Sequence, residues 1–446
     1  MQFKINRIET YGMKNLSKKI CVDFQNQTSN NLKNKDVSNI KAIYGSNGAG
    51  KSAFIHSVEL YKNLVSKKNY LYQDSIQKEL QDLVNDKIKK FFFNVVFTFN
   101  DSYENKELTK ILKHEITIKF DGDRYNISKE ELSILSDQTI NGNYKKIYSN
   151  INGVLDFSDK YNDKATEFII NKTNNLLKQS SVNSYFDDYD FIYSLKKILD
   201  ALNKEEIKSS KIIMMPYLLA SNINTYLDED DMYVSCKTDL LERIVDNLKI
   251  EREYYRNKIS SGEDLISKED IKNYESKIKR LCKFVQVFKH DLLDIKIEKI
   301  EDKHLYHCRK KLVYKDYKVD SSNESTGIKK LMRIFNSIEA VTNGCISFID
   351  ELDSNINPIY LNKLLEYLQK TNKGQLCFTS HNMYPMHFLY SFSHSIDFLG
   401  ETGKLVSWKK NGNYKPYNKY PEGMIDDSPF NVDYFDFIKV FESEGE

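Results

Sequence analysis

The stretch that most constrains the fold runs from residue 40 to residue 58 and reads IKAIYGSNGAGKSAFIHSV. Its first residues form a short apolar run that is typical of a buried strand. Beyond the glycines, apolar side chains return at helical spacing, at Phe54, Ile55, Val58, Tyr61 and Val65. A glycine-rich loop therefore lies between a strand and a helix, and this order favours an α/β fold.

The loop G-S-N-G-A-G-K-S fits the P-loop pattern of glycine, four free positions, glycine, lysine and serine or threonine. Glycines allow successive backbone N–H groups to converge on a phosphate chain at the start of a helix. We expect Lys51 to reach the β- and γ-phosphates and the Ser52 hydroxyl to bind Mg²⁺. The predicted ATP-binding residues are Gly45, Ser46, Asn47, Gly48, Ala49, Gly50, Lys51 and Ser52.

An acidic pair follows a second apolar strand far downstream, in GCISFIDELDSNINP. Beside a P-loop, Asp350 is placed to hold Mg²⁺ and Glu351 to polarise the attacking water. The alternative is a pair of acids at an ordinary strand end. A third apolar strand, in GQLCFTSHN, ends next to His381, which is suited to contact the γ-phosphate or the attacking water.

A further motif, SSNESTGIKKLMRIF, places Ser325 and Gly327 at the start of an amphipathic helix. A serine and a glycine at this position can bind a second γ-phosphate through hydroxyl and N–H groups. A simple helix cap is the alternative interpretation. The order of loop, helix start, D-E strand and histidine strand is more specific than any one part.

Together these motifs resemble the ABC-type ATPase heads of the SMC, RecF and OLD-like group. GSNGAGKS resembles their Walker A motif, ESTGIKK the signature, ISFIDE Walker B, LDSNINP the D-loop and TSHN the switch-histidine strand, over residues 1–100 and 305–400. The resemblance implies a Mg²⁺-dependent ATPase that forms a homodimer or higher homo-oligomer, with Ser325 and Gly327 of one head closing on ATP in the other. Two departures are Asn357-Pro358 in place of the common His-Pro, and the lack of a recognisable Q-loop glutamine.

Within this group the short insertion, ESTGIKKL and EGMIDDSPFNVDYFDFIKVFE most resemble OLD-like AAA-family ATPases of abortive-infection and other phage-defence systems, such as AbiL and PARIS. That resemblance implies a sensor or scaffold in anti-phage defence. OLD nucleases carry a TOPRIM nuclease domain after the ATPase, and the sequence after His381 is too short for one. We therefore expect a TOPRIM-type nuclease or toxin to be a separate chain.

The domain organisation expected from these motifs is an ABC-type ATPase head split by a mainly helical insertion. The head comprises residues 1–124 and 301–446, and the insertion residues 125–300. Strands are expected near 3–8, 20–24 and 91–99, and in a hairpin around the Asp121-Gly122 turn. A helical hairpin is expected from helices at 240–259 and from 271 onward, the second preceded by a Ser267–Asp270 capping box.

Charge and composition limit the partners. The net charge of +2 gives no strong overall field, so DNA contact needs a local patch. Residues 268–289 carry seven basic side chains against three acidic ones, and we prefer a solvated face to a phosphate contact there. The Asp228–Asp231 cluster is likewise interpreted as a solvated loop.

The six cysteines lack metal-ligand spacing. No signal or membrane segment is apparent, so we expect a cytoplasmic protein without membrane contact.

A second function remains open, that of a RecF- or SMC-like DNA-repair ATPase that binds DNA directly. A transporter subunit is disfavoured because ESTGIKK is not the L-S-G-G-Q signature and the insertion is too large. A small-molecule kinase would not need the signature helix. The sequence thus favours a defence ATPase, with a repair ATPase as the alternative.

Overall fold

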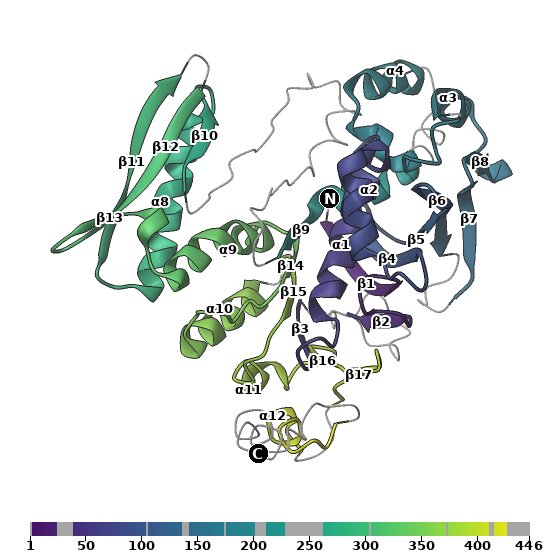
Figure 1. Cartoon of the computed structure of the whole chain (residues 1–446). Coiled ribbons are helices and arrows are strands. Elements are labelled where there is room, and N and C mark those ends of the chain that lie inside the picture. The colour runs from purple at the N-terminus through teal and green to yellow at the C-terminus, as the bar shows by residue number, and fades with distance from the viewer. Residues whose placement is uncertain are drawn as a thin grey trace, which may run out of the picture.

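The computed structural model describes residues 2–24, 39–103, 106–135, 142–173, 175–200, 211–227, 262–302, 305–371, 373–409 and 414–425 (Figure 1). The strands are β1 (Gln2–Tyr11), β2 (Ile20–Asp23), β3 (Ile40–Tyr44), β4 (Lys90–Tyr103), β5 (Lys106–Phe120), β6 (Tyr125–Leu135), β7 (Tyr144–Ile151), β8 (Val154–Phe157), β9 (Ile223–Tyr226), β10 (Asp264–Ser267), β11 (Leu292–Asp302), β12 (Leu305–Tyr314), β13 (Lys318–Asp320), β14 (Ile346–Ile349), β15 (Gln375–Thr379), β16 (Ile396–Leu399) and β17 (Leu405–Ser407). The helices are α1 (Lys51–Ser66), α2 (Asp74–Leu83), α3 (Lys164–Thr173), α4 (Tyr189–Leu199), α6 (Met215–Asn222), α8 (Ile271–Phe288), α9 (Thr326–Thr342), α10 (Pro358–Thr371), α11 (Met386–Leu389) and α12 (Pro416–Lys419), with short 3₁₀ helices η1 (Tyr70–Tyr72), η2 (Asp159–Tyr161), η3 (Val182–Asp187) and η4 (Ser321–Asn323). The predicted α/β class is confirmed.

A six-stranded sheet of order β17-β16-β3-β15-β14-β9 forms the centre of the fold. Strands β16, β3, β15, β14 and β9 run parallel, and β17 pairs antiparallel with β16. All residues of β3, β14, β15 and β9 are buried, as expected for parallel strands covered on both faces. This double burial explains the unbroken apolar runs in the sequence.

A seven-stranded antiparallel sheet, β2-β1-β4-β5-β6-β7-β8, packs beside it. The predicted strands near residues 3, 20 and 91 and the hairpin at Asp121-Gly122 are confirmed as β1, β2, β4 and β5–β6. However, the prediction that residues after 125 are mainly helical is wrong at its start, because β6, β7 and β8 continue this sheet. Charged residues on β6 obscure the strand pattern in the sequence. Lys129 on β6, for example, pairs with Glu115 at 2.8 Å and with Glu131 at 3.2 Å.

Further strands within the expected insertion belong to two other sheets. β9 lies at the edge of the central sheet, and β10 and β11 join the third sheet, whose order is β10-β12-β11 with β13 on β12. The boundary expected at residue 124 falls between two paired strands of one sheet. The division into three domains stays a prediction. The helix expected at 240–259 and the Asp228–Asp231 cluster lie outside the described residues.

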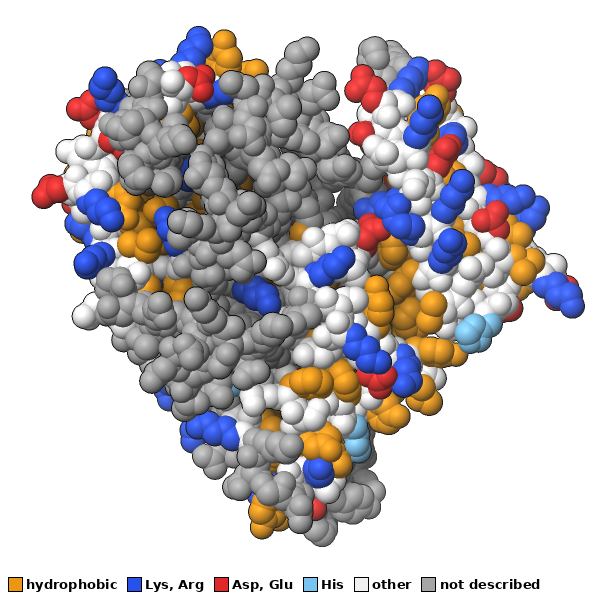
Figure 2. Space-filling model, turned by 180° about the vertical axis from the view of Figure 1, so that it is seen from behind, with side chains coloured by type: hydrophobic (Ala, Val, Ile, Leu, Met, Phe, Trp, Pro, Cys, Tyr) orange, Lys and Arg blue, Asp and Glu red, His pale blue; other side chains and the backbone are white. Residues whose placement is uncertain are grey.

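The third sheet and α8 form a separate lobe, at the left in Figure 1. The predicted helix from residue 271 is confirmed, and the Asp270 N–H donates to Ser267 Oγ at 3.1 Å in front of it. Figure 2 shows basic and acidic side chains interspersed over this lobe. Four of the seven basic residues form ion pairs, namely Lys268, Lys277, Arg280 and Lys289, as a solvated face predicts.

Helix α1 lies between the central and the antiparallel sheets (Figure 1). On one side Phe54 meets Phe348 of β14, with ring centroids 6.1 Å apart. On the other side Tyr61 stacks on Phe93 of β4 at 4.5 Å. Both sheets therefore determine where this helix, and the glycine-rich loop at its start, is held.

A buried ion pair joins two strands of the central sheet. Lys41 Nζ on β3 lies 2.7 Å from Asp397 Oδ2 on β16, and both side chains are 0% exposed. A buried charge is stable only when it is paired and hydrogen-bonded. The pair therefore fixes the strand that leads into the loop. No helix among the described residues is long and apolar enough to span a membrane, and the cytoplasmic location stays a prediction.

We expect Lys41→Met to lower the free energy of unfolding by about 3–5 kcal/mol, because it leaves Asp397 buried without its partner. Adding Asp397→Leu should recover most of this loss. The control is Lys363→Met, which removes a surface pair with Glu366 and should cost under about 1 kcal/mol. Urea denaturation measures all three. A Lys41→Met protein as stable as the unsubstituted protein would contradict the assignment.

Candidate nucleotide and metal site

The glycine-rich loop connects β3 to α1, as predicted. Lys51 is the first residue of α1, and its Nζ donates to the carbonyl oxygens of Gly45 and Ser46, each at 2.9 Å. These contacts curl the loop around the ammonium group. Burial lowers the pKa of Lys51, while the negative charges of Asp350, Glu351 and Asp353 act in the opposite direction. Loop lysine and downstream acids therefore share one electrostatic environment.

Glycine is required at two positions of the loop. Gly50 has a φ of +108°, and a Cβ there would lie 2.6 Å from Leu16 Cδ2. At Gly45 a Cβ would lie 2.4 Å from the carbonyl oxygen of Leu399. The tight winding of the loop against Leu16 and Leu399 therefore depends on the absence of side chains at Gly50 and Gly45.

Sequence reasoning missed a turn that supports this loop. The turn after β1 places Leu16 against Gly50, and Asn15 Nδ2 donates to the Gly48 carbonyl. It is closed by the Gly12 N–H, which donates to the Leu16 carbonyl at 2.7 Å. The segment YGMKNL has neither helical nor strand periodicity, so no pattern could reveal the contact.

The topology brings the predicted catalytic residues together. Strand β15 lies between β3 and β14 and is parallel to both, so the residues after the three strands meet at one edge of the sheet. Thr379, at the end of β15, donates through Oγ1 to Asp350 and accepts from the Glu351 N–H at 2.8 Å. Glu351 Oε1 lies 4.0 Å from His381 Nε2. The sequence did not indicate this role for Thr379.

The donor set near the loop fits Mg²⁺. Asp350 is 6% exposed and follows β14, while Ser52 is half-buried in the first turn of α1. Carboxylate and hydroxyl oxygens suit this hard cation, which is commonly held by few protein ligands together with water and phosphate oxygens. No group of three or more His, Cys, Asp or Glu side chains that could hold a metal exists among the described residues. Ser46 Oγ is buried without a hydrogen-bond partner in the described chain, which suits a phosphate oxygen.

Ser325 and Gly327 lie at the start of α9, as predicted. Ser325 caps the helix by accepting from the Ile328 N–H at 3.4 Å, and its side chain is exposed. No hydrogen bond or ion pair joins either residue to Gly45–Ser52 within the described chain. A Cβ on Gly327 would lie 2.7 Å from the Asn355 carbonyl oxygen, so this helix start packs on the loop after Glu351.

The D-loop, LDSNINP at residues 352–358, is held on its other side as well. Asp353 Oδ2 accepts from the Asn382 N–H at 3.0 Å, directly after His381. Asn357 explains one departure from the family pattern, because its Oδ1 accepts from the Ile359 N–H at 3.0 Å and caps α10. Asparagine is a favoured cap, and proline is favoured at the first helical position that follows it.

Strand β9, which lies beside β14 at the edge of the central sheet, contains no glutamine. β9 pairs in parallel with β14, and the Asp350 N–H donates to the Tyr226 carbonyl at 2.8 Å. The chain that follows Leu227 lies outside the described residues. A Q-loop residue is therefore not assigned.

Comparisons with known proteins give a likeness of fold. No protein-family model and no curated protein matches the chain. Among solved structures, an Smc head domain with an extended coiled coil from Pyrococcus furiosus, bound to the C-terminal domain of ScpA, is 14% identical, with a TM-score of 0.40 and coverage of 91% of this chain and 96% of that one. An SMC head domain from Thermotoga maritima is 12% identical, with a TM-score of 0.34 and coverage of 91% and 100%.

The recombination mediator RecF, in a structure described as RecF-ATPrS, is 13% identical, with a TM-score of 0.37 and coverage of 92% and 99%. At these identities the likeness concerns the fold alone.

We expect Thr379→Val to weaken binding of a Mg²⁺-bound, slowly hydrolysed ATP analogue by about tenfold or more, since hydrogen bonds to charged groups contribute about 1.5–3 kcal/mol. The substitution preserves shape but removes the contacts to Asp350 and Glu351. Thr371→Val is the control, because its hydroxyl donates to the Leu368 carbonyl at the end of α10 and, among the described residues, bonds neither Asp350 nor Glu351. Calorimetric titration measures affinity. Equal affinity for both variants would show that Thr379 does not organise the site.

Proposed function

We propose that the protein is a Mg²⁺-dependent ABC-type ATPase. The observation that carries this proposal is the meeting of Lys51, Asp350, Glu351 and His381 at the carboxyl edge of three adjacent parallel strands. Ligand sites in α/β sheets are typically found at this edge.

Each residue has a role that its position allows. Lys51 can turn from the Gly45 and Ser46 carbonyls to the β- and γ-phosphates, while loop N–H groups bind the phosphate chain. Ser52 and Asp350 would hold Mg²⁺, which neutralises developing charge on the phosphates. Glu351 orients and polarises the attacking water, and His381 contacts the γ-phosphate from the neighbouring strand.

The exposed start of α9 supports a site completed by a second copy of the chain. Ser325 is exposed, and neither it nor Gly327 contacts the loop of its own chain through a hydrogen bond or ion pair. Hydroxyl and N–H groups at a helix start suit a γ-phosphate presented by another head. We therefore propose that two heads enclose ATP between them, each completing the other's site.

Mixing two inactive variants tests this shared site. Lys51→Ala disables the loop and Ser325→Arg blocks the helix start, so each variant alone should not hydrolyse ATP. Mixed in equal amounts they should recover about a quarter of the normal rate, because random pairing yields mixed dimers with one intact site. Phosphate release measures the rate. Absence of recovery, in mixtures shown to exchange subunits, would contradict a site shared between copies.

We propose that this ATPase is a sensor or scaffold in anti-phage defence that controls a separate effector, a TOPRIM-type nuclease or a toxin. The support is the resemblance of ESTGIKKL and EGMIDDSPFNVDYFDFIKVFE to OLD-like ATPases. Ion pairing of four of the seven basic residues in the segment 268–289 also weakens the case for direct DNA binding.

The DNA-repair alternative has one observation in its favour. Lys272, Lys279 and Lys283 are exposed on α8 and have no ion pair among the described residues. Their spacing places them along one side of the helix, where they could follow a phosphate backbone. DNA binding by this side should weaken steeply as salt rises.

We expect Glu351→Gln to bind ATP, to hydrolyse it at a rate reduced by about 10² or more, and to accumulate as a dimer or larger assembly. Glu366→Gln on the surface of α10 is the matched control and should behave normally. Light scattering and phosphate release measure these effects. Normal hydrolysis by Glu351→Gln would remove this residue from the catalytic role.

Affinity purification of Glu351→Gln from its native cells then separates the two functions. A stoichiometric nuclease or toxin among the bound proteins supports the defence role. DNA alone, released at high salt, supports the repair role instead. The Glu366→Gln control identifies partners whose capture does not depend on trapped ATP.

A further inference from the structure

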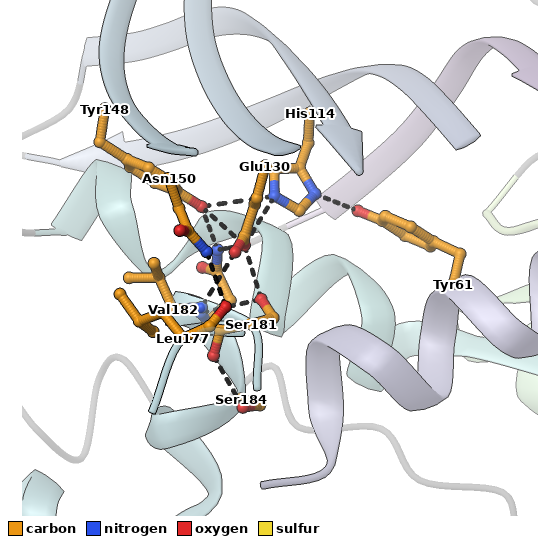
Figure 3. Close-up of polar contacts among 10 residues, drawn as sticks. Tyr61, His114, Glu130, Tyr148, Asn150, Leu177, Ser181, Val182 and Ser184 are labelled. Atoms are coloured by element: carbon orange, nitrogen blue, oxygen red, sulfur yellow. Dashed lines mark hydrogen bonds and ion pairs between the residues drawn. The ribbon is translucent and has the colours of Figure 1, made fainter. Parts of the chain in front are cut away.

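A second buried polar cluster lies outside the nucleotide site (Figure 3). It centres on Glu130 of β6 and His114 of β5, both 0% exposed. Tyr148 of β7, Ser181 and the first residues of η3 surround the carboxylate. Tyr61 completes the cluster. It belongs to α1, the helix that begins at the glycine-rich loop. None of these residues has a part in the proposed ATPase chemistry.

Five hydrogen-bond donors surround the buried carboxylate of Glu130. These are Ser181 Oγ (2.6 Å), Val182 N (3.1 Å), Tyr148 OH (3.2 Å), His114 Nε2 (3.3 Å) and Asn183 Nδ2 (3.4 Å). Burial by itself raises the pKa of Glu130, but hydrogen bonds from His114, Ser181 and Val182 outweigh it and hold the pKa below its usual value. Glu130 is therefore an ionised anchor inside the protein.

The direction of the hydrogen bonds follows from this charge. A carboxylate only accepts, so His114 Nε2 carries the proton that it donates to Glu130. On the other side of the ring, Nδ1 forms a hydrogen bond with Tyr61 OH, 2.9 Å away. Burial and the charge of Glu130 raise the pKa of Tyr61 well above its usual value, so the hydroxyl keeps its proton. The chain from Tyr61 through His114 to Glu130 is thus continuous.

The segment 180–188, which includes Ser181 and η3, also contacts the chain just beyond the end of α1 directly. Asn69, just beyond the helix, donates through its backbone N–H to Ser180 Oγ at 3.0 Å, and Ser180 Oγ donates to Asn69 Oδ1 at 3.1 Å. Lys68 pairs with Asp188, which caps α4. The segment 180–188 therefore contacts the C-terminal end of α1 in two ways. It bonds Lys68 and Asn69 directly, and it reaches Tyr61 through Glu130 and His114.

We infer that Tyr61, His114 and Glu130 are positioning residues that couple the antiparallel sheet and the segment 180–188 to nucleotide binding through α1. Since α1 begins at Lys51, a shift of its far end moves the glycine-rich loop. Coupling of this kind is reciprocal: nucleotide binding must also change the stability of the segment 180–188. This inference rests on the proposed nucleotide site.

Tyr61→Phe tests the inference, because it keeps the ring that stacks on Phe93 and removes only the hydroxyl. Binding of a Mg²⁺-bound, slowly hydrolysed ATP analogue should weaken by about fivefold or more. The control is Tyr274→Phe on α8, whose equally buried hydroxyl donates to Asp264 at 2.6 Å in the other lobe. Its affinity should be unchanged. Urea denaturation of both variants shows the loss of stability separately from the loss of affinity.

Hydrogen exchange of the unsubstituted protein gives a second readout that does not depend on a variant folding. Adding the analogue should slow amide exchange in residues 181–187 as well as in α1, and leave β11 and β12 unchanged. Equal affinity of Tyr61→Phe and the unsubstituted protein, or protection confined to the loop and α1, would overturn the coupling. Failure of the unsubstituted protein to bind the analogue would instead overturn the proposed site itself.

Discussion

The parallel pairing of β15 with both β3 and β14 is the constraint on which the site depends. Each strand is only four or five residues long, yet each is wholly buried and ends at the same edge. Because parallel strands align their carboxyl ends, three loops from distant parts of the chain are placed side by side. Thr379 then joins two of these loops by bonding both Asp350 and the Glu351 N–H. The chemistry thus follows from strand order.

The parts of this arrangement that sequence could predict are those with local signals. Three features leave a signal in the sequence within about ten residues: the glycine pattern, the short apolar runs and the cap at Ser325. The structure contains all three. Strands β7, β8 and β9 leave no such signal, and β6 leaves one only at its start, next to the Asp121-Gly122 turn. β6 presents charged residues that pair across the sheet, and β9 follows directly on the buried helix α6, so its four residues cannot be separated from the helix by composition.

Long-range polar contacts were beyond prediction for a different reason. Asn15 and Glu130 are ordinary residues in their local sequence, and only the fold brings them to Gly48 and His114. A buried carboxylate is expensive unless many donors converge on it, and such convergence is a property of the whole packing. These contacts therefore depend on several sheets and segments at once, whereas the pattern that identifies the glycine loop lies within its own eight residues.

The absence of a side chain at Gly327 has a consequence for how two nucleotides could affect each other. The start of α9 lies flat against the Asn355 carbonyl, and the D-loop is tied in turn to Asn382 through Asp353. If two heads share the site as proposed, the surface that one subunit offers to its neighbour's nucleotide is in direct contact with its own D-loop. In a closed pair of heads, occupancy of one site would be felt at the other without any movement of the distant lobes.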